Sequence, residues 1–104
     1  MKTKVDGSLY ELENFDNKDI AGQEIQFIQK GFDVMFPEEF ITLMDGTTNE
    51  EVLKMLIDRM NYLQDKASCR ENVVAITKLE EALMWLNKRT ANRIERGVEG
   101  KPLK

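Results

Sequence analysis

The last third of this chain, residues 68–97, carries a helical pattern that no proline interrupts. Apolar residues recur there at steps of three, four and seven, at Val73, Ile76, Leu79, Leu83 and Leu86. This is the period of an α-helix with one buried stripe. The pattern predicts a start at a capping box, Ser68 with Glu71, and an end at Gly97, which can adopt the left-handed conformation of many helix ends. We therefore expect one helix of about 28 residues, on the order of 40 Å long.

A second helix is predicted immediately before the first. Thr48 and Glu51 form another capping box, and the apolar face that follows consists of Leu53, Leu56, Ile57, Met60 and Leu63. This helix runs to about residue 65, and the linker is so short that the two helices must form an antiparallel αα-hairpin. Since the first helix is shorter, the second extends beyond it from about Trp85. The overhang carries three arginines, Arg89, Arg93 and Arg96.

The first half of the chain has the patterns of short strands. Residues 24–30 begin by alternating polar and apolar side chains, and residues 39–44 form a second β-rich run. They predict a two-stranded antiparallel element, which must pack on the helices because it would be only marginally stable alone. The expected fold class is α+β, a short antiparallel β element followed by a long antiparallel αα-hairpin. The predicted parts are a polar N-terminal arm or edge strand (1–23), the β element (24–46), the helical hairpin domain (47–97) and a tail (98–104).

Composition narrows the range of functions. A chain of 104 residues supports one small domain with a small core, for which oligomerisation is the usual remedy. With no histidine and one cysteine, Cys69, the sequence lacks the ligands of a structural zinc site and the usual general base. We therefore expect no enzyme, no metal and no cofactor. We also expect no membrane span and no signal peptide, and a single cysteine fits a reducing cytosol.

The net charge of −4 is unevenly distributed. Residues 86–104 contain six basic and two acidic residues, a balance of 6 − 2 = +4, so the rest of the chain carries −4 − 4 = −8. This split disfavours a general DNA or RNA binder, which spreads positive charge over a face. It is compatible with a compact anion site at one helix end. Association between the acidic part of one copy and the basic part of another is equally compatible with it.

Four side chains are candidates for a binding site, and each also has a plainer interpretation. Arg89 and Arg93 share a helical face with Arg96, and arginines have the forked geometry that suits phosphate. Cations also favour a helix C-terminus for electrostatic reasons alone, and the residues by themselves favour that interpretation. Tyr62 borders the buried stripe, where an aromatic ring either packs or stacks on a base. Asn72 either bonds local backbone or reads a purine edge. Trp85 is more often core or interface filler than a base-stacking platform.

Six runs of residues resemble a known phage family. They are TTNEEVL (47–53), LIDR (56–59), REN (70–72), TKLEEALMWLN (77–87), RTANR (89–93) and RGVEG (96–100). The family is the anti-defence "sponge" group that shares a helical hairpin and is known from Thoeris anti-defence and anti-CBASS proteins. The TKLEEA-x-MW-x-N block is the most specific part of the resemblance, which covers roughly the C-terminal half. With two expected strands before the hairpin, the chain is more similar to the Thoeris branch than to the shorter, all-helical anti-CBASS branch.

The resemblance implies a binding protein that does no chemistry. Members of the family hold cyclic nucleotide immune signals intact in the cytoplasm of the infected host, and they assemble as dimers and hexamers. The signal is a cyclic ADP-ribose isomer in the Thoeris branch and a cyclic di- or trinucleotide in the anti-CBASS branch, and some members bind both classes at separate sites. Alignment on the hairpin implies that Tyr62 stacks on the ligand and that Asn72 bonds its base or ribose. It implies that Arg89 and Arg93 hold the phosphates.

The spacing of these four residues implies a second subunit. Tyr62 and Asn72 flank the hairpin turn, whereas Arg89 is about 25 Å further along the second helix. A small cyclic nucleotide cannot reach both ends of one hairpin, so we expect a homo-oligomer in which a neighbouring copy, packed antiparallel, completes each site. Two rival hypotheses stay open: an enzyme that degrades the same signal, and a helical hairpin that binds a host protein.

Overall fold

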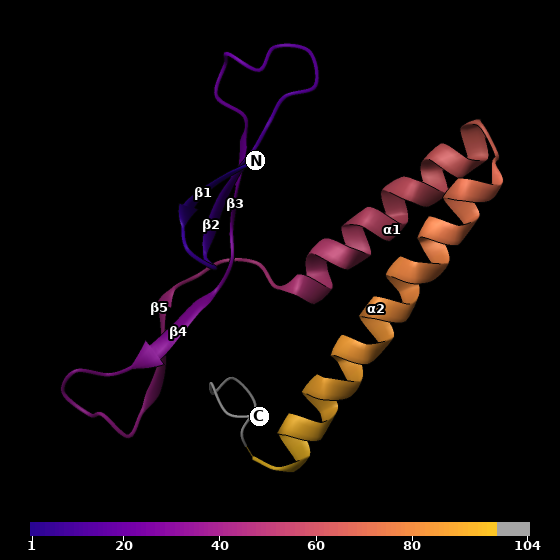
Figure 1. The fold of residues 1–104 in the computed structure, drawn as a ribbon. Helices are drawn as coiled ribbons and strands as arrows, with labels where there is room; N and C mark the ends of the chain where they lie inside the picture. Colours follow the sequence, from indigo (N-terminus) through magenta and orange to yellow (C-terminus); the bar gives the residue numbers. More distant parts are fainter. Residues whose placement is uncertain (98–104) are drawn as a thin grey trace. The chain divides into compact units, whose positions relative to one another are not determined.

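The structure, a computed structural model, describes residues 1–97 of the chain. Five β-strands are followed by two α-helices, so the α+β fold class and the order of its elements are confirmed. The chain divides into two compact units (Figure 1), a β unit of residues Met1–Thr48 and a helical unit that begins at Asn49. The predicted tail, 98–104, lies outside the described residues.

The β unit contains two small antiparallel sheets. In the first sheet, β1 (Lys2–Val5), β2 (Leu9–Leu12) and β3 (Gln23–Gln26) are hydrogen-bonded in that order. In the second sheet, β4 (Gln29–Phe32) pairs with β5 (Phe40–Met44). Each of these three strand pairings joins strands that follow one another in the chain, so both sheets are built from successive hairpins.

The strand arrangement differs from the expected two-stranded element. The alternating segment 24–30 is divided between β3 and β4, and the N-terminal residues supply two further strands, β1 and β2. Between β3 and β4 the chain leaves the first sheet and enters the second. At this point the Ile28 amide donates to the Thr47 carbonyl and the Thr47 amide donates to the Gln26 carbonyl, both at 2.8 Å. Gly46 permits this approach, because a Cβ at that position would collide with the backbone of Gln26. An alternating pattern indicates which face a residue occupies but not which strand it pairs with, so it did not reveal the change.

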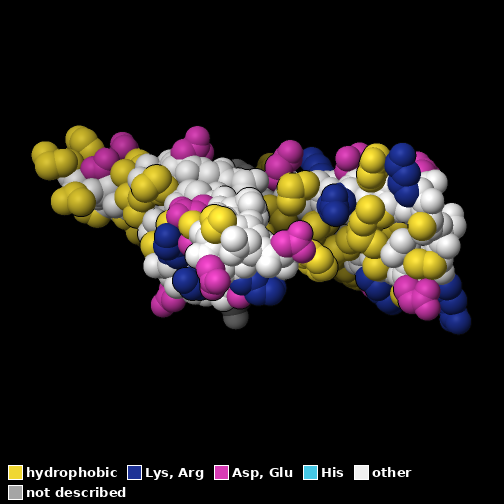
Figure 2. Space-filling view, turned by 90° about the horizontal axis from the view of Figure 1, so that it is seen from above, with side chains coloured by type: hydrophobic (Ala, Val, Ile, Leu, Met, Phe, Trp, Pro, Cys, Tyr) yellow, Lys and Arg dark blue, Asp and Glu magenta, His cyan; other side chains and the backbone are white. Residues whose placement is uncertain are grey.

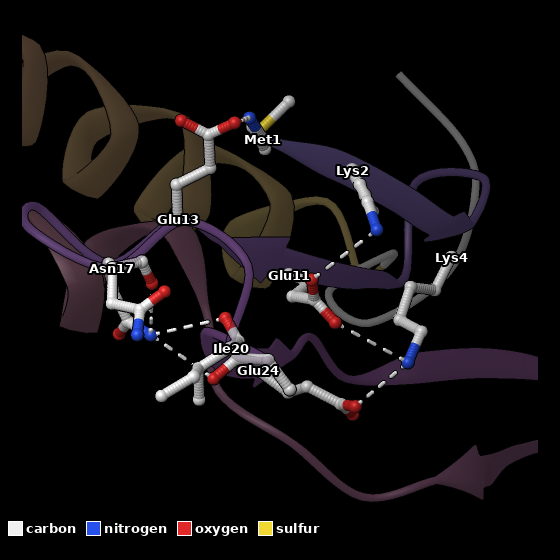
Figure 3. A network of polar contacts seen from close by, with 10 residues as sticks. Met1, Lys2, Lys4, Glu11, Glu13, Asn17, Ile20 and Glu24 are labelled. Atoms are coloured by element: carbon white, nitrogen blue, oxygen red, sulfur yellow. Dashed lines mark hydrogen bonds and ion pairs between the residues drawn. The ribbon is translucent and has the colours of Figure 1, made fainter.

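Charged side chains bridge the three strands of the first sheet (Figure 3). The Lys4 ammonium of β1 donates to the Glu24 carboxylate of β3 at 3.0 Å, and it lies 3.7 Å from the Glu11 carboxylate of β2. The Glu24 carboxylate, assisted by Glu11, raises the pKa of Lys4. Because Lys4 and Glu24 are exposed, these ion pairs contribute little to stability and are weakened further by salt.

The helical unit is the predicted antiparallel hairpin. Its helices, α1 (Asn49–Lys66) and α2 (Arg70–Glu95), lie side by side in Figure 1. They have 18 and 26 residues, so α2 is about 12 Å longer at 1.5 Å per residue. The C-terminal end of α2 therefore extends beyond the start of α1, as the sequence predicted.

The two ends of α2 confirm one predicted cap and correct the other. Gly97 has a φ of +71°, the left-handed conformation expected of it. The capping box at Ser68 is wrong, because α2 begins at Arg70 with Cys69 as its N-cap and has no side-chain cap. The Ser68 hydroxyl instead donates to the Gln64 carbonyl at 2.9 Å. A serine directly after a helix can bond the last carbonyls of that helix, and here this competes with capping the next one.

Many apolar side chains lie on the surface of both units (Figure 2). The loop between β4 and β5 presents Val34, Met35 and Phe36, which are 94%, 79% and 61% exposed. Despite this apolar surface, no helix in the described part of the chain is long and apolar enough to cross a membrane. Among the described residues only Ser8 and Ile76 are buried, so a single copy has very little core.

Candidate functional site

The overhanging end of α2 carries a hollow rich in positive charge. It has a volume of about 650 Å³ and is lined by Trp85, Lys88, Arg89, Asn92, Arg93, Glu95 and Arg96. Most of these positions follow one another at steps of three and four, so their side chains share one face of the helix. Four basic residues and one acidic residue give the cationic hollow a charge of 4 − 1 = +3. This charge and size suit a small anion.

Two of the predicted site residues, Arg89 and Arg93, lie together in the cationic hollow. Within residues 1–97, neither guanidinium has a carboxylate within ion-pair distance. Arg89 is exposed and Arg93 is half-buried. The Nε atom of Arg93 is shielded from solvent and has no hydrogen-bond partner in the described part of the chain. A shielded charged donor without a partner costs free energy, so this end of α2 favours an added acceptor such as a phosphate oxygen.

The helix dipole accounts for only part of this positive charge. Cations in the last turn of a helix are stabilised by the partial negative charge of the exposed carbonyl groups, and the effect falls off within that turn. Arg93 lies in the last turn of α2, but Lys88 and Arg89 precede it. The dipole therefore does not explain why Lys88 and Arg89 lie on the same face as Arg93.

An exposed aromatic side chain borders the cationic residues. Trp85 is 54% exposed, although the sequence suggested a core or interface role. The Lys88 ammonium lies 5.0 Å from the centre of its ring, a distance at which the cation is attracted to the π face. In the single copy, Trp85 is thus a surface residue, and the core interpretation does not apply to it.

The other two predicted residues lie at the turn end of the hairpin. Tyr62 is exposed near the end of α1, and the Lys66 ammonium lies 5.3 Å from the centre of its ring. Asn72 is half-buried in the first turn of α2. Within residues 1–97 its side-chain amide makes no hydrogen bond. Both side chains therefore retain capacity for a ligand, one for stacking and one for hydrogen bonds.

The four predicted residues form two pairs at opposite ends of the hairpin. Asn72 and Arg89 belong to the same continuous helix and are about 25 Å apart along its axis. The structure brings Arg89 and Arg93 together and places Tyr62 and Asn72 near the turn. One copy does not bring the two pairs together, and a shared site that joins them stays a prediction.

A second depression, of about 620 Å³, crosses the hairpin between α1 and α2. Its charged lining consists of Lys54, Asp58 and Glu80, which sum to 1 − 2 = −1. The binding of an anion is electrostatically less favourable in this depression than in the cationic hollow. In addition, no group of three or more histidine, cysteine or carboxylate side chains among the described residues could hold a metal ion.

The sequence pattern had suggested no ligand role for three residues that line the hollow, Lys88, Asn92 and Glu95. It had placed Arg96 on the same face as Arg89 and Arg93, and it had favoured a packing role over base stacking for Trp85. The regular helical spacing of these lining residues was the available signal, because it places them on the face that carries Arg89 and Arg93. The overhang itself was predicted from the unequal helix lengths, but the exposed fraction of each side chain on it was not.

The hairpin and its overhang agree with a known family. The family model for the Acb2/Tad1 hairpin domain matches residues 24–91, well over half of the chain. The chain belongs to this family. The match includes Tyr62, Asn72 and Arg89, and Arg93 lies just beyond its end. The family resemblance inferred from the sequence is therefore confirmed.

A phage protein supports the same family branch. The chain is 61% identical over 57 residues to Thoeris anti-defense 1 of Bacillus phage SBSphiJ7. The match covers 54% of this chain and 40% of that relative. The chain thus spans less than half of the relative's length, and the resemblance is to the Thoeris branch of the family.

Proposed function

We propose that this protein is a phage anti-defence sponge, which binds a cyclic nucleotide immune signal in the cytoplasm of the infected host and holds it without cleaving it. The proposal rests on membership of the Acb2/Tad1 hairpin family together with the similarity to a Thoeris anti-defense protein. The observation that carries it in the structure is the cationic hollow, where Arg89 and Arg93 lie side by side without carboxylate partners among residues 1–97.

The preferred signal is a cyclic ADP-ribose isomer, because the relative from Bacillus phage SBSphiJ7 is a Thoeris anti-defense protein. Cyclic di- or trinucleotides are a second ligand class under the same proposal. In either case Arg89 and Arg93 bind the phosphates, Tyr62 stacks on the base, and Asn72 bonds the base or ribose. These four roles are the ones that the family resemblance implied from the sequence. The exposure of Tyr62 and the positive charge around Arg89 and Arg93 support them.

The complete site is shared by two copies. Arg89 and Arg93 of one copy approach Tyr62 and Asn72 of a neighbour that is packed antiparallel, so a two-fold axis creates two equal sites per dimer. Dimers then associate further, up to a hexamer. The scarcity of buried residues in a single copy supports such an assembly.

Sequestration requires tight binding and no reaction. Nanomolar affinity corresponds to about −12 kcal/mol, which charge-assisted hydrogen bonds and burial between rigid helices are able to supply. The sequence has no histidine, and its single cysteine, Cys69, lies at the opposite end of α2 from the hollow. The residues lining the hollow include one carboxylate, Glu95, so a convergent acid–base pair is missing from that lining.

Calorimetric titration with cyclic ADP-ribose isomers and with cyclic di- and trinucleotides tests the proposal. The loaded protein is then denatured, and the released compound is analysed by chromatography and mass spectrometry. We expect tight binding of at least one compound, which is recovered unchanged. Recovery of hydrolysed products would indicate an enzyme instead. No heat and no thermal shift with any compound would favour a hairpin that binds a host protein.

A further inference from the structure

The cationic hollow contains more than phosphate-binding groups. Its lining includes Trp85, the single tryptophan of the sequence, next to the arginines. Binding of inorganic phosphate or of a sugar phosphate does not require an indole ring. An exposed indole ring is also unfavourable in water, because it leaves apolar surface uncovered. The exposed ring therefore requires an explanation of its own.

We propose that Trp85 is a base-stacking residue, and that the hollow recognises an aromatic base together with the phosphates attached to it. This inference rests on the proposed function and deepens it, because it names which part of the ligand the α2 end contacts. The ligand class is a nucleotide whose base lies between the indole of Trp85 and the Tyr62 ring of the neighbouring copy, while its phosphates lie on Arg89 and Arg93. Phosphate compounds without a base are bound less tightly.

The positions along α2 fit this assignment. Trp85, Arg89 and Arg93 succeed one another at steps of four on one helical face, with axial separations of about 6 Å from each to the next. A single nucleotide can bridge that span from its base to its phosphate. The direction is also set: the base lies toward the middle of α2 and the phosphates lie toward its C-terminal end.

Lys88 restricts the orientation of the Trp85 ring. Its ammonium lies 5.0 Å from the ring centre of Trp85, and this attraction restricts the indole to fewer orientations before a ligand arrives. Trp85 is nevertheless 54% exposed, so the lysine does not cover it. Base stacking on an aromatic side chain tolerates any base, since every base has a π face. Discrimination among bases then falls to polar groups such as Asn92 and Glu95 in the same lining.

Because Trp85 is the only tryptophan in the sequence, its fluorescence reports on this contact directly. Cyclic ADP-ribose and a cyclic dinucleotide serve as probes with a base, and inorganic pyrophosphate serves as a probe without one. We expect every nucleotide that binds by calorimetry to quench the emission with the same midpoint. We expect pyrophosphate to bind more weakly and to leave the emission nearly unchanged.

A set of variants separates stacking from a structural role. Trp85→Ala should weaken nucleotide binding roughly fivefold to a hundredfold, the range typical of losing one base stack, without changing the affinity for pyrophosphate. Trp85→Phe should retain most of the affinity, since it keeps an aromatic face. The control is Val74→Ala, which removes another exposed apolar side chain of α2 that lies outside the hollow. This control should bind like the unaltered protein.

Three results would overturn the inference. Base stacking is refuted if a nucleotide gives calorimetric heat but leaves the Trp85 emission unchanged. It is also refuted if Trp85→Ala loses affinity for nucleotide and for pyrophosphate equally. Neither result contradicts the sponge proposal. The absence of heat with every probe refutes the sponge proposal, and base stacking falls with it. Sedimentation of Trp85→Ala checks its assembly, and rescue by Trp85→Phe excludes a general folding defect.

Discussion

At the level of residues, Arg89 and Arg93 of the cationic hollow differ in their exposure to solvent. Arg93 is half-buried, with its Nε atom shielded and unpartnered within residues 1–97, whereas Arg89 beside it is exposed. A partly desolvated guanidinium forms stronger hydrogen bonds to an anion than an exposed one, because less solvent competes for its donors. Among the cations of the hollow, Arg93 should therefore contribute most to ligand affinity.

Replacing Arg93 with alanine tests this ranking. Arg93→Ala should weaken nucleotide binding by about tenfold or more, as expected for one lost hydrogen bond to a charged group, and should leave the oligomer size unchanged. Calorimetry and sedimentation measure the two quantities. The control is Lys78→Ala, which removes an exposed cation of α2 that does not line the hollow. If Arg93→Ala binds as tightly as this control, the phosphate assignment is wrong.

At the level of elements, the two helices of the hairpin differ in length, and this leaves the C-terminal end of α2 without α1 beside it. The first helix has 18 residues and the second has 26. The hollow is lined by the C-terminal part of α2, whose end extends past the start of α1. The helix must end in a defined way for this overhang to be rigid. Gly97 has a φ of +71° and open space where a Cβ would lie, so it ends the helix through backbone conformation alone.

A side chain at Gly97 should therefore destabilise the helical unit through backbone strain. Gly97→Ala should lower the free energy of unfolding by about 1 kcal/mol, since the left-handed region is unfavourable for an L-residue with a Cβ. Chemical denaturation followed by circular dichroism measures the change. Gly97→Asn is the matched control and should cost less, because asparagine tolerates this conformation. An alanine variant as stable as the unaltered protein would show that this cap does not matter for stability.

At the level of the whole molecule, the single copy lacks the core of a stable globular protein. Only Ser8 and Ile76 are buried among residues 1–97, while apolar residues such as Met84 and Ile94 are more than half exposed on α2. Burying apolar surface is the main favourable term in folding. A chain with so little of it buried gains stability by covering that surface with further copies.

We therefore expect a homo-oligomer whose thermal midpoint rises with protein concentration, because association is linked to folding by mass action. Sedimentation across a range of concentrations and thermal melts at the same concentrations measure both effects. A dimer or a multiple of dimers agrees with a site shared by two copies. A monomer that binds the nucleotide with full affinity contradicts it.

The helical hairpin could be predicted from the sequence because its signals are local. The apolar period of residues 68–97, the short linker and Gly97 each act within one or two turns of helix. The family resemblance and the concentration of arginines near the C-terminal end are also visible in the sequence alone. The cap at Ser68 was mispredicted because the same hydroxyl had two nearby backbone partners, and local pattern does not rank them.

Other features became visible only in the folded chain. The division of segment 24–30 between two sheets depends on hydrogen bonds to Thr47, which is distant in the sequence. The exposure of Trp85 and the shielding of Arg93 were also not visible in the sequence pattern. Periodicity assigns a residue to a face of its own element, but solvent access and strand partners are set by contacts between elements, and these require three-dimensional coordinates.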